Sequence, residues 1–318
     1  MKISVFIDGA AGTTGIEIAQ RLGDRDDICL VTLDEASRKD AAARANALRS
    51  CDFAILCLPD EAAHEAAALA EGSGVRIIDA SSAHRTAAGW TYGFPELAAV
   101  QREAIATASR VSNPGCYPTA FLALVAPLVA RKLIPADHGY IVHAVSGYSG
   151  GGKAMIARFE ADAVTGHHPE GAIAWRGYGL SLDHKHLPEM RVHAGLAHTP
   201  LFAPAVVGAY RGMVVEVPLR RDTDPRIAPA DELAAALADH YAGSPMVGFG
   251  PLGDGAEIVL RQDSPPSDRL DLALFPSADG KLIRLVARLD NLGKGASGAC
   301  VQNLNIMAGL PETAGLRL

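Results

Sequence analysis

The first third of the chain alternates short apolar runs with longer amphipathic ones. The apolar runs predict strands, and the amphipathic runs predict helices joined by short loops. The expected strands are residues 3–7, 28–33, 53–58 and 75–79, and the expected helices are residues 14–22, 41–48 and 61–71. This alternation predicts an α/β domain with a doubly wound parallel sheet. The continuous apolar strands fit burial on both faces of that sheet.

The pattern changes after about residue 113, where the strand-like runs become longer and alternate more regularly. These runs are residues 140–145, 213–219, 256–260, 270–275 and 282–289. The last two flank Ser277-Ala278-Asp279-Gly280, which is a hairpin turn signal. We therefore expect a second, α+β domain with a mixed, largely antiparallel sheet. An apolar helix is expected at 120–133, and a last helix at 298–308.

Composition narrows the class of protein. A length of 318 residues fits two domains. The formal net charge of -7, without a long basic run, argues against nucleic acid or an anionic membrane as partner. No stretch approaches the roughly 20 apolar residues of a membrane span. The five cysteines form no C-x-x-C pair and are odd in number, so we expect no disulfide framework and a reducing, cytoplasmic compartment.

A glycine-rich turn follows the first expected strand and opens the first expected helix. Its G-x-x-G-x-x-G pattern lets the backbone turn tightly and approach a pyrophosphate, which then faces the helix N-terminus. In this context the pattern predicts a Rossmann-type dinucleotide site. The alternative is a turn that only packs a helix against a strand. The expected cofactor contacts here are Gly9, Ala11, Gly12, Thr13, Thr14 and Gly15.

The residues after the second expected strand carry two conflicting signals about the cofactor. Asp34 stands where an acid would bind the ribose 2′-OH of NAD. Ser37-Arg38-Lys39 follows, and two adjacent cations suit a 2′-phosphate. A solvated loop is the alternative for these cations. We favour NADP(H), bound by Ser37, Arg38 and Lys39, with Asp34 pointing elsewhere.

One cysteine stands out by its surroundings. Cys116 lies in Ser112-Asn113-Pro114-Gly115-Cys116-Tyr117-Pro118-Thr119, just ahead of the helix expected at 120–133. The helix dipole and its unpaired N–H groups favour the thiolate, which is the nucleophilic form. A buried structural cysteine is the alternative, but the flanking Pro-Gly and the upstream glycine turn favour a nucleophile. Cys29, Cys51 and Cys57 lie in or beside apolar runs and are expected to act as small hydrophobes.

Two further elements offer groups for catalysis or binding. His184-Lys185-His186-Leu187-Pro188-Glu189 is a dense, proline-bounded element that can supply a general acid/base beside Cys116. No further ligand at suitable spacing completes a zinc site there, so we expect no metal. The 146–153 segment, Ser-Gly-Tyr-Ser-Gly-Gly-Gly-Lys, offers hydroxyls, N–H groups and a lysine to a phosphate or carboxylate. A flexible loop with an exposed lysine is its alternative.

Together and in this order, these elements resemble the N-acetyl-gamma-glutamyl-phosphate reductases in their shorter form. That family lies within the wider group of glyceraldehyde-phosphate and aspartate-semialdehyde dehydrogenases. The resemblance spans essentially the whole chain and rests on residues 9–15, 113–116, 146–153, 184–189 and 290–299. Ser-Asn-Pro-Gly-Cys-Tyr-Pro-Thr and His-Lys-His-Leu-Pro-Glu are the specific motifs. Gly152 is a minor departure, since longer relatives commonly carry alanine there.

The resemblance implies roles for individual residues. Cys116 would be the nucleophile and His186 the general acid/base, chosen over His184. The expected substrate-binding residues are Arg85, Asn113, Ser146, Ser149, Gly150, Lys153, His184 and Glu189. The expected cofactor contacts outside the glycine turn and the 37–39 segment are Leu58, Pro59, Ser81, Asn291 and Gly295.

The resemblance also implies an architecture and a reaction. Residues 1–112 plus 291–318 would form the NADP-binding domain, with residues 113–290 as an inserted catalytic and oligomerisation domain. The reaction would be NADPH-dependent reduction of N-acetyl-glutamyl 5-phosphate to the semialdehyde, with release of phosphate, by a homo-oligomer (dimer or tetramer). A sister reductase acting on aspartyl phosphate or a carrier-linked aminoadipyl phosphate is the first alternative. A non-enzymatic NADP-binding regulator is the second, and the intact Cys116, His186 and 146–153 segment argue against it.

Overall fold

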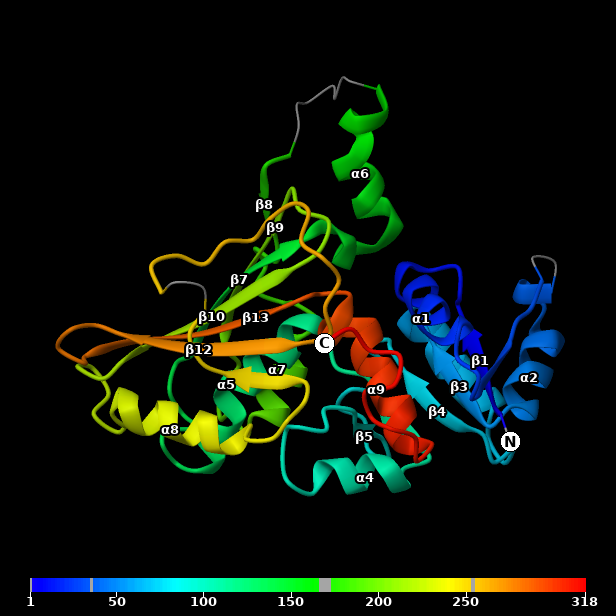
Figure 1. The fold of residues 1–318 in the computed structure, drawn as a ribbon, viewed down its shortest axis with the longest axis horizontal. Coiled ribbons are helices and arrows are strands. Elements are labelled where there is room, and N and C mark those ends of the chain that lie inside the picture. The colour runs from blue at the N-terminus through cyan, green and yellow to red at the C-terminus, as the bar shows by residue number, and fades with distance from the viewer. Residues whose placement is uncertain (1, 35–36, 166–172, 253–254) are drawn as a thin grey trace. The chain divides into compact units, whose positions relative to one another are not determined.

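The computed structural model describes residues 2–34, 37–165, 173–252 and 255–318 (Figure 1). The chain divides into two compact units. The first consists of Met1–Gly115 and Ala296–Leu316, and the second of Cys116–Gly295 and Arg317–Leu318. The chain thus leaves the first unit slightly later, and returns to it slightly later, than the expected 112/113 and 290/291 boundaries. No helix in the described ranges is long and apolar enough to cross a membrane.

The first unit is built on a parallel sheet. Its strands are β1 (Ile3–Asp8), β2 (Ile28–Val31), β3 (Phe53–Leu56), β4 (Arg76–Asp79), β5 (Thr91–Tyr92) and β6 (Arg110–Ser112). Their order is β2-β1-β3-β4-β6-β5, and each pairing is parallel. The predicted doubly wound α/β arrangement is confirmed, and the four strands expected from apolar runs are its first four.

Helices cover both faces of this sheet because successive strand residues point to opposite sides. The helices are α1 (Thr13–Gly23), α2 (Ala41–Ser50), α3 (Asp60–Leu69), α4 (Gln101–Thr107) and α9 (Gly298–Met307), with a short 3₁₀ turn at Ser37–Lys39. Val5 and Ile7 of β1 pack with residues of α1 and α9. Phe6, between them, packs with residues of α2 and α3. The helix from the end of the chain therefore completes the core of the first unit.

The second unit is built on a mixed sheet. Its strands are β7 (Ile141–Gly147), β8 (Trp175–Gly177), β9 (Leu201–Val207), β10 (Met213–Arg220), β11 (Val247–Phe249), β12 (Leu270–Pro276) and β13 (Leu282–Leu289). The order is β11-β12-β13-β10-β7-β9-β8. The β11–β12 and β7–β9 pairs are parallel and the other pairs antiparallel, which confirms a mixed, largely antiparallel sheet.

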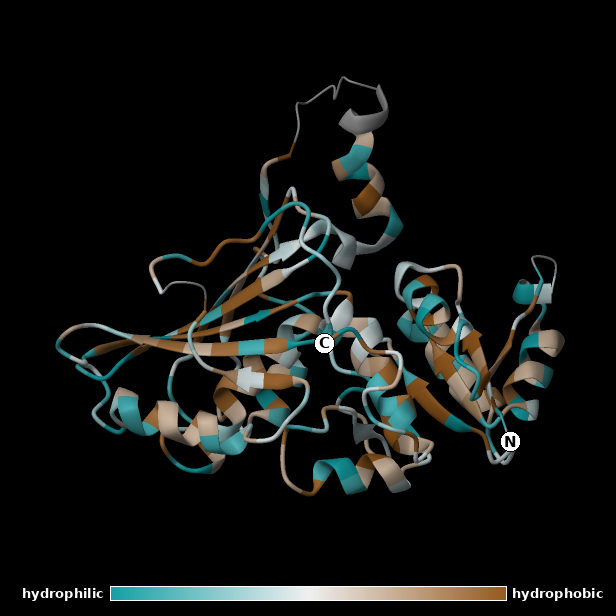
Figure 2. Ribbon diagram, in the orientation of Figure 1, coloured by the Kyte–Doolittle hydropathy of each residue, from teal (hydrophilic) through white to brown (hydrophobic). Residues whose placement is uncertain are grey.

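The two faces of the second sheet differ. Its helices are α5 (Cys116–Ala130), α6 (Gly152–Thr165), α7 (Leu187–His193) and α8 (Ala230–His240). Helix α5 is buried along most of its length and packs on β10 and β13 and against α7 and α8. The opposite face holds a cavity of about 430 Å³ lined by residues of β7, β10, β12 and β13 and by the 255–260 segment. In Figure 2 apolar residues concentrate along the strands of both sheets.

One predicted strand is wrong. Residues 256–260 form no strand, and β11 pairs with β12 at the sheet edge instead. The segment is mostly apolar, and Ile258 packs against the cluster of Leu252, Ala273 and Val286 while Glu257 and Val259 are exposed. An irregular apolar segment lying on a sheet can thus resemble a strand in sequence. The apolar helix also begins earlier than expected, at Cys116 itself.

Candidate active site

The glycine turn has the backbone geometry that a dinucleotide site needs. Gly9 has φ +88°, and a Cβ there would lie 2.3 Å from the carbonyl oxygen of Cys57. A Cβ on Gly15 would lie 2.5 Å from the carbonyl oxygen of Gly9. Helix α1 begins at Thr13, and no side chain caps its N-terminus. The first-turn N–H groups are therefore available to an anion, which fits the pyrophosphate of a dinucleotide.

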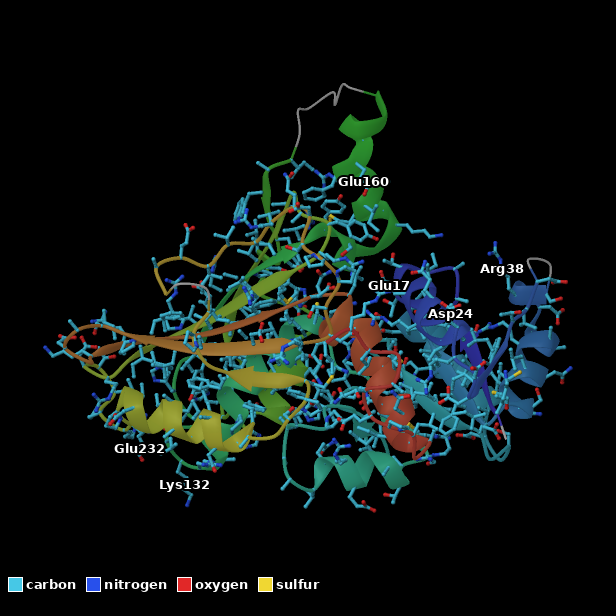
Figure 3. The ribbon with its side chains drawn as sticks, in the orientation of Figure 1. Glu17, Asp24, Arg38, Lys132, Glu160 and Glu232 are labelled. Carbon is cyan, nitrogen blue, oxygen red and sulfur yellow. The ribbon has the colours of Figure 1, made fainter. Side chains whose placement is uncertain are left out.

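In the turn after β2, Arg38 is exposed, whereas the carboxylate of Asp34 is hydrogen-bonded within the turn itself. The carboxylate of Asp34 accepts the Ser37 N–H at 2.7 Å, and the Asp34 carbonyl accepts the Arg38 N–H at 3.0 Å. Arg38 is exposed, and its side chain projects from the ribbon in Figure 3. The Lys39 side chain lies outside the described part of the chain. An acid bound to its own turn is poorly placed for a ribose hydroxyl.

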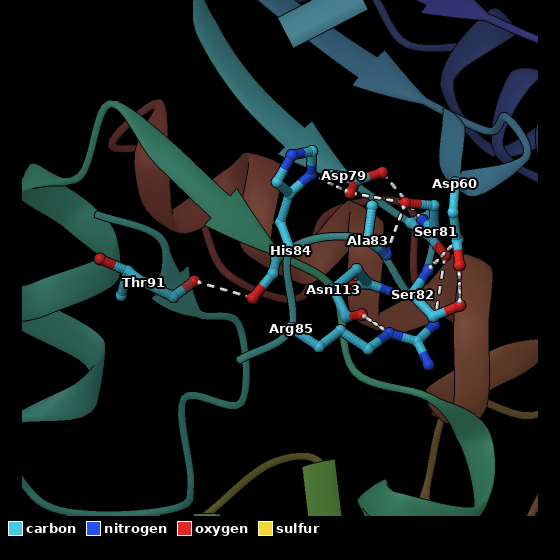
Figure 4. A network of polar contacts seen from close by, with 11 residues as sticks. Asp60, Asp79, Ser81, Ser82, Ala83, His84, Arg85, Thr91 and Asn113 are labelled. Carbon is cyan, nitrogen blue, oxygen red and sulfur yellow. Dashed lines mark hydrogen bonds and ion pairs between the residues drawn. The ribbon is translucent and has the colours of Figure 1, made fainter. Parts of the chain in front are cut away.

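The loop after β4 is held by a buried carboxylate (Figure 4). Asp79, with 0% exposure, accepts the Ser81 N–H at 2.9 Å and the Ser81 hydroxyl at 2.7 Å. The Nδ1 atom of His84 lies 2.6 Å from Oδ2 of the same carboxylate. The His84 ring also stacks on Trp90, with ring centroids 4.0 Å apart. Ser81, expected beside the nicotinamide, is thus fixed in place by Asp79.

The same loop is tied at two other points. Asp60, the first residue of α3, accepts the Ser82 N–H at 2.9 Å and its hydroxyl at 2.8 Å. Arg85 is buried and donates to the carbonyl oxygens of Asn113 (3.1 Å) and Ala80 (3.3 Å). These contacts hold the 80–85 loop in place after β4.

Asn113 and the 58–59 segment also lie in the first unit. The Asn113 amide donates to the Ala296 carbonyl at 3.0 Å and accepts from Asn303 at 3.1 Å. Leu58 lies beside the glycine turn, 3.2 Å from where a Gly9 Cβ would be. Pro59 precedes α3 as its N-cap. The structure therefore gives Asn113 and Arg85 contacts that fix the backbone, while Leu58 lines the glycine turn.

In the second unit, Cys116 is the first residue of α5 and is half-buried. Gly295 packs directly on it, since a Cβ at 295 would lie 2.8 Å from the Cys116 Cβ. The same atom would lie 3.1 Å from the Asp290 carbonyl oxygen. A helix N-terminus stabilises a thiolate through its dipole and free N–H groups. Gly295 keeps space beside the thiol open.

Three other cysteines, Cys51, Cys57 and Cys300, have raised pKa values. Burial raises the pKa of Cys57 to about 12, with Asp79 and Asp8 adding to the effect. Burial also raises the pKa of Cys51, and that of Cys300 well above its ordinary value. These thiols stay protonated at neutral pH, and a protonated thiol is a poor nucleophile.

The two histidines of the 184–189 element lie against the residue that follows the cysteine. The ring centroid of Tyr117 is 6.1 Å from that of His184 and 5.9 Å from that of His186. Nδ1 of His184 accepts the backbone N–H of His186 at 3.1 Å. Burial, with a smaller effect of Lys185, lowers the pKa of His184 to about 4. His184 is therefore a neutral, fixed ring that supports His186.

Two tyrosines complete this part of the site. The Tyr178 hydroxyl donates to the Tyr117 hydroxyl at 3.2 Å. Burial raises the pKa of Tyr178 to about 12, and the charge of Cys116 is a further cause. Burial likewise raises the pKa of Tyr117 well above its ordinary value. Both hydroxyls remain protonated, and they form a chain in which Tyr178 donates to Tyr117 and Tyr117 donates to the Ala205 carbonyl at 3.5 Å.

The 146–153 segment forms a compact loop after β7. Asn291 donates to the Ser149 hydroxyl at 2.9 Å and accepts the Gly212 N–H at 2.9 Å. A Cβ on Gly150 would lie 3.3 Å from the same Asn291 amide nitrogen and 3.9 Å from the Ser146 hydroxyl. The structure thus brings Ser146, Ser149, Gly150 and Asn291 together. Both ends of the Asn291 amide are used within the second unit.

Lys153 and Glu189 differ in their surroundings. Lys153 is exposed at the start of α6, whereas Glu189 is buried in the first turn of α7. In the ranges that the structure describes, no group of three or more His, Cys, Asp or Glu residues is arranged to hold a metal ion.

Sequence reasoning missed several polar residues that shape the site. Asp8 and Asp79 each end a buried strand, a position where an acid is unusual and could have been noticed. Asn303 is fully buried in α9, within the polar run Gln302-Asn303 of an otherwise apolar helix. Tyr178 had no sequence signal, because only the tertiary fold brings it to Tyr117.

The two units define the class of protein. Residues 4–108 match the semialdehyde dehydrogenase NAD binding domain, and residues 116–291 match the semialdehyde dehydrogenase dimerisation domain. A probable aspartate-semialdehyde dehydrogenase from Pseudomonas aeruginosa shares the fold, with a TM-score of 0.74 over 97% of this chain and 99% of that one, at 17% identity. The chain is an oxidoreductase of the semialdehyde dehydrogenase type with a nicotinamide dinucleotide as its cofactor.

Relatives narrow the assignment. The chain is 50% identical to N-acetyl-gamma-glutamyl-phosphate reductase of Burkholderia orbicola, over 98% of this chain and 99% of the relative. It is 48% identical to N-acetyl-gamma-glutamyl-phosphate reductase 2 of a Nostoc species, over 99% of both chains. It therefore belongs to the N-acetyl-gamma-glutamyl-phosphate reductase family, as its motifs predicted.

Proposed function

We propose that the protein reduces N-acetyl-glutamyl 5-phosphate to the 5-semialdehyde with NADPH and releases inorganic phosphate. The observation that carries this proposal is the position of Cys116 at the N-terminus of α5, with two histidines packed against the next residue. A thiolate and an imidazole are the groups that acyl transfer from a phosphate requires. Relatives with half of their residues identical carry the name of this reaction.

The first chemical step uses the thiolate of Cys116. It attacks the acyl carbon, the C–O bond to the phosphate breaks, and phosphate leaves behind a thioester. N–H groups at the start of α5 are suited to hold the oxyanion that forms during this attack. A nicotinamide dinucleotide held at the glycine turn and the start of α1 would supply the hydride for reduction of the thioester. The C–S bond then breaks, which releases the semialdehyde and restores the thiolate.

His186 handles protons in this scheme. It removes the thiol proton when the thiolate forms, and it returns the one proton that the overall reduction consumes. The low pKa of His184, about 4, supports this division because a ring that stays neutral cannot exchange protons near pH 7. His184 instead accepts the His186 N–H and orients the start of α7.

Binding roles are proposed for the remaining candidates. Lys153 is exposed and suits an anionic group of the substrate, together with Ser146, while Ser149 and Gly150 shape their loop. Arg38 suits the adenosine 2′-phosphate of NADP. The thiols that stay protonated fit work in a reducing cytoplasm.

A homo-oligomer is part of the proposal. The match to a dimerisation domain covers the second unit. The face of its sheet that carries the cavity is not covered by α5 or α8, and it is the surface we propose for a second copy. Dimer and tetramer are both compatible with one such face.

The test follows phosphate-dependent NADP reduction in the reverse direction, with N-acetylglutamate semialdehyde and with aspartate semialdehyde. Turnover with the first alone supports the proposal, and loss of that turnover in Cys116→Ser with intact NADPH binding supports the thioester. Turnover with the second alone keeps the chemistry and assigns the protein to the sister reaction. Tight NADPH binding without turnover on either substrate would favour a carrier-linked substrate or a regulator.

A further inference from the structure

A buried ion pair joins the end of β1 to helix α2. Nε of Arg44 lies 3.2 Å from both carboxylate oxygens of Asp8, and Nη2 lies 2.8 Å from Oδ2. The Asp8 side chain is 6% exposed and the Arg44 side chain 16% exposed. Hydrogen bonding to Asp8 is the main cause that raises the pKa of Arg44. Arg44 therefore keeps its positive charge beside this carboxylate.

Asp8 is an unusual residue for its place. It ends β1 and directly precedes Gly9, the first residue of the glycine turn. Phe6 packs on the side of α2 and α3, and side-chain alternation points Asp8 to the same side. A carboxylate beside an anion-binding turn repels phosphate. Arg44 removes that penalty by neutralising it.

Asp8 occupies only one edge of the Arg44 guanidinium. Asp8 engages Nε and Nη2. Among the described residues, no hydrogen bond or ion pair engages Nη1, and Glu65 acts on the guanidinium only through its charge. Guanidinium groups carry five N–H donors in a planar fork, so one edge can serve a second anion while the other is held.

Backbone hydrogen bonds also link Arg44 to the 37–39 turn, which carries the exposed Arg38. The Asp40 N–H donates to the Ser37 carbonyl, and the Arg44 N–H donates to the Asp40 carbonyl, each at 3.0 Å. The Asp40 carboxylate caps α2 by accepting the Ala43 N–H at 2.7 Å. These bonds link the 37–39 turn rigidly to Arg44. The Asp8 pair then fixes that whole connection against the glycine turn.

We propose that Arg44 is a specificity-determining residue whose Nη1 edge binds the adenosine 2′-phosphate of NADP together with Arg38. Asp8 is a positioning residue that holds the opposite edge of the guanidinium. This inference rests on the proposed use of NADP(H), and it goes beyond that proposal by assigning the preference to a residue outside the 37–39 turn.

The experiment measures NADPH and NADH dissociation constants by nicotinamide fluorescence for wild type, Arg44→Gln and a control. The control is Arg49→Gln, because Arg49 is exposed on the same helix and donates only to the Leu69 carbonyl among its described contacts. Arg44→Gln should raise the NADPH constant about tenfold more than the NADH constant, because both cofactors carry the pyrophosphate that Asp8 repels but only NADPH carries the 2′-phosphate. The control should change neither constant.

A double variant separates direct binding from charge neutralisation. Asp8→Asn with Arg44→Gln removes the buried charge as well as the cation, so it also guards against a single variant that misfolds. It should still bind NADPH poorly. Recovery of NADPH binding in the double variant, or equal loss of both cofactors in Arg44→Gln, would overturn the inference. A wild type that prefers NADH would instead refute the proposed cofactor, which is a separate result.

Discussion

Adding one methyl group at Gly295 should misplace the nucleophile. A Cβ there would lie 2.8 Å from the Cys116 Cβ and 3.1 Å from the Asp290 carbonyl oxygen. Ordinary contacts between such atoms begin near ~3.5 Å, so Cys116 must shift by roughly 0.7 Å in Gly295→Ala. A displacement of about 1 Å at a reacting group costs about 10²-fold in rate. Overpacking of this kind should also lower the free energy of unfolding by about 1–3 kcal/mol.

The assay compares kcat, NADPH binding and the rate of iodoacetamide labelling of Cys116 in Gly295→Ala and Gly250→Ala. Gly250 is a matched control in the same unit, because a Cβ there would meet nothing within 4 Å. We expect Gly295→Ala to lose about 10²-fold in kcat at saturating NADPH, and Gly250→Ala to remain near wild type. Wild-type kcat in Gly295→Ala would refute the reasoning that close packing at 295 positions the thiol.

Three other substitutions or conditions test the site. Gly9→Ala should abolish NADPH binding and destabilise the fold by about 3 kcal/mol, since its φ is +88° and its Cβ would lie 2.3 Å from a carbonyl oxygen; calorimetry and fluorescence titration measure both. Asp79→Asn should loosen the 80–85 loop and weaken cofactor binding about tenfold, because a fully buried acceptor of three contacts is lost; unchanged affinity would contradict this. Burial lowers the pKa of His184 to about 4 in the folded protein, whereas the ring has its ordinary pKa of about 6.5 in the unfolded chain. Below pH ~6.5 the unfolded chain therefore binds a proton that the folded protein does not. Stability should therefore be full above pH ~6.5 and fall by about 1–2 kcal/mol toward pH 4, after allowing for partial exposure of the ring; urea unfolding of wild type and His184→Gln at both pH values should show the difference.

The sequence predicted the parts of the fold that follow from long, regular patterns. The first four strands of the parallel sheet are continuous apolar runs, and the β12–β13 hairpin follows its Ser277-Ala278-Asp279-Gly280 turn. Strand β9 escaped prediction because Pro204 lies inside it, paired with Ala144. Strands β5 and β6 are too short to produce any pattern. The false strand at 256–260 shows that a short apolar run can resemble a strand in sequence when it only packs on a sheet.

The residues of the candidate site also fall into those that the sequence predicted and those that it did not. Cys116, the glycine turn and the 184–189 element were found because they are contiguous motifs whose chemistry is local. Tyr178 and Arg44 were not found, because each acts through a partner far away in sequence. Contacts between residues that lie far apart in the sequence produce no periodic pattern in that sequence. The one local signal was the partner of Arg44, since Asp8 is an acid at the end of a buried strand.

The last helix explains why the end of the chain must return to the first unit. Asn303 of α9 is fully buried and donates to the Gly93 carbonyl at 2.9 Å and to the Asn113 side chain at 3.1 Å. A Cβ on Gly93 would lie 2.4 Å from the Asn303 amide nitrogen, so glycine is needed for this approach. Buried amides without partners are costly, which makes such a contact specific. Asn113 is therefore anchored from α9, from Arg85 and from Asp79 before the chain continues to Cys116. The terminal helix thus fixes Asn113 within the first unit, close to the point where the chain passes to the second unit at Cys116.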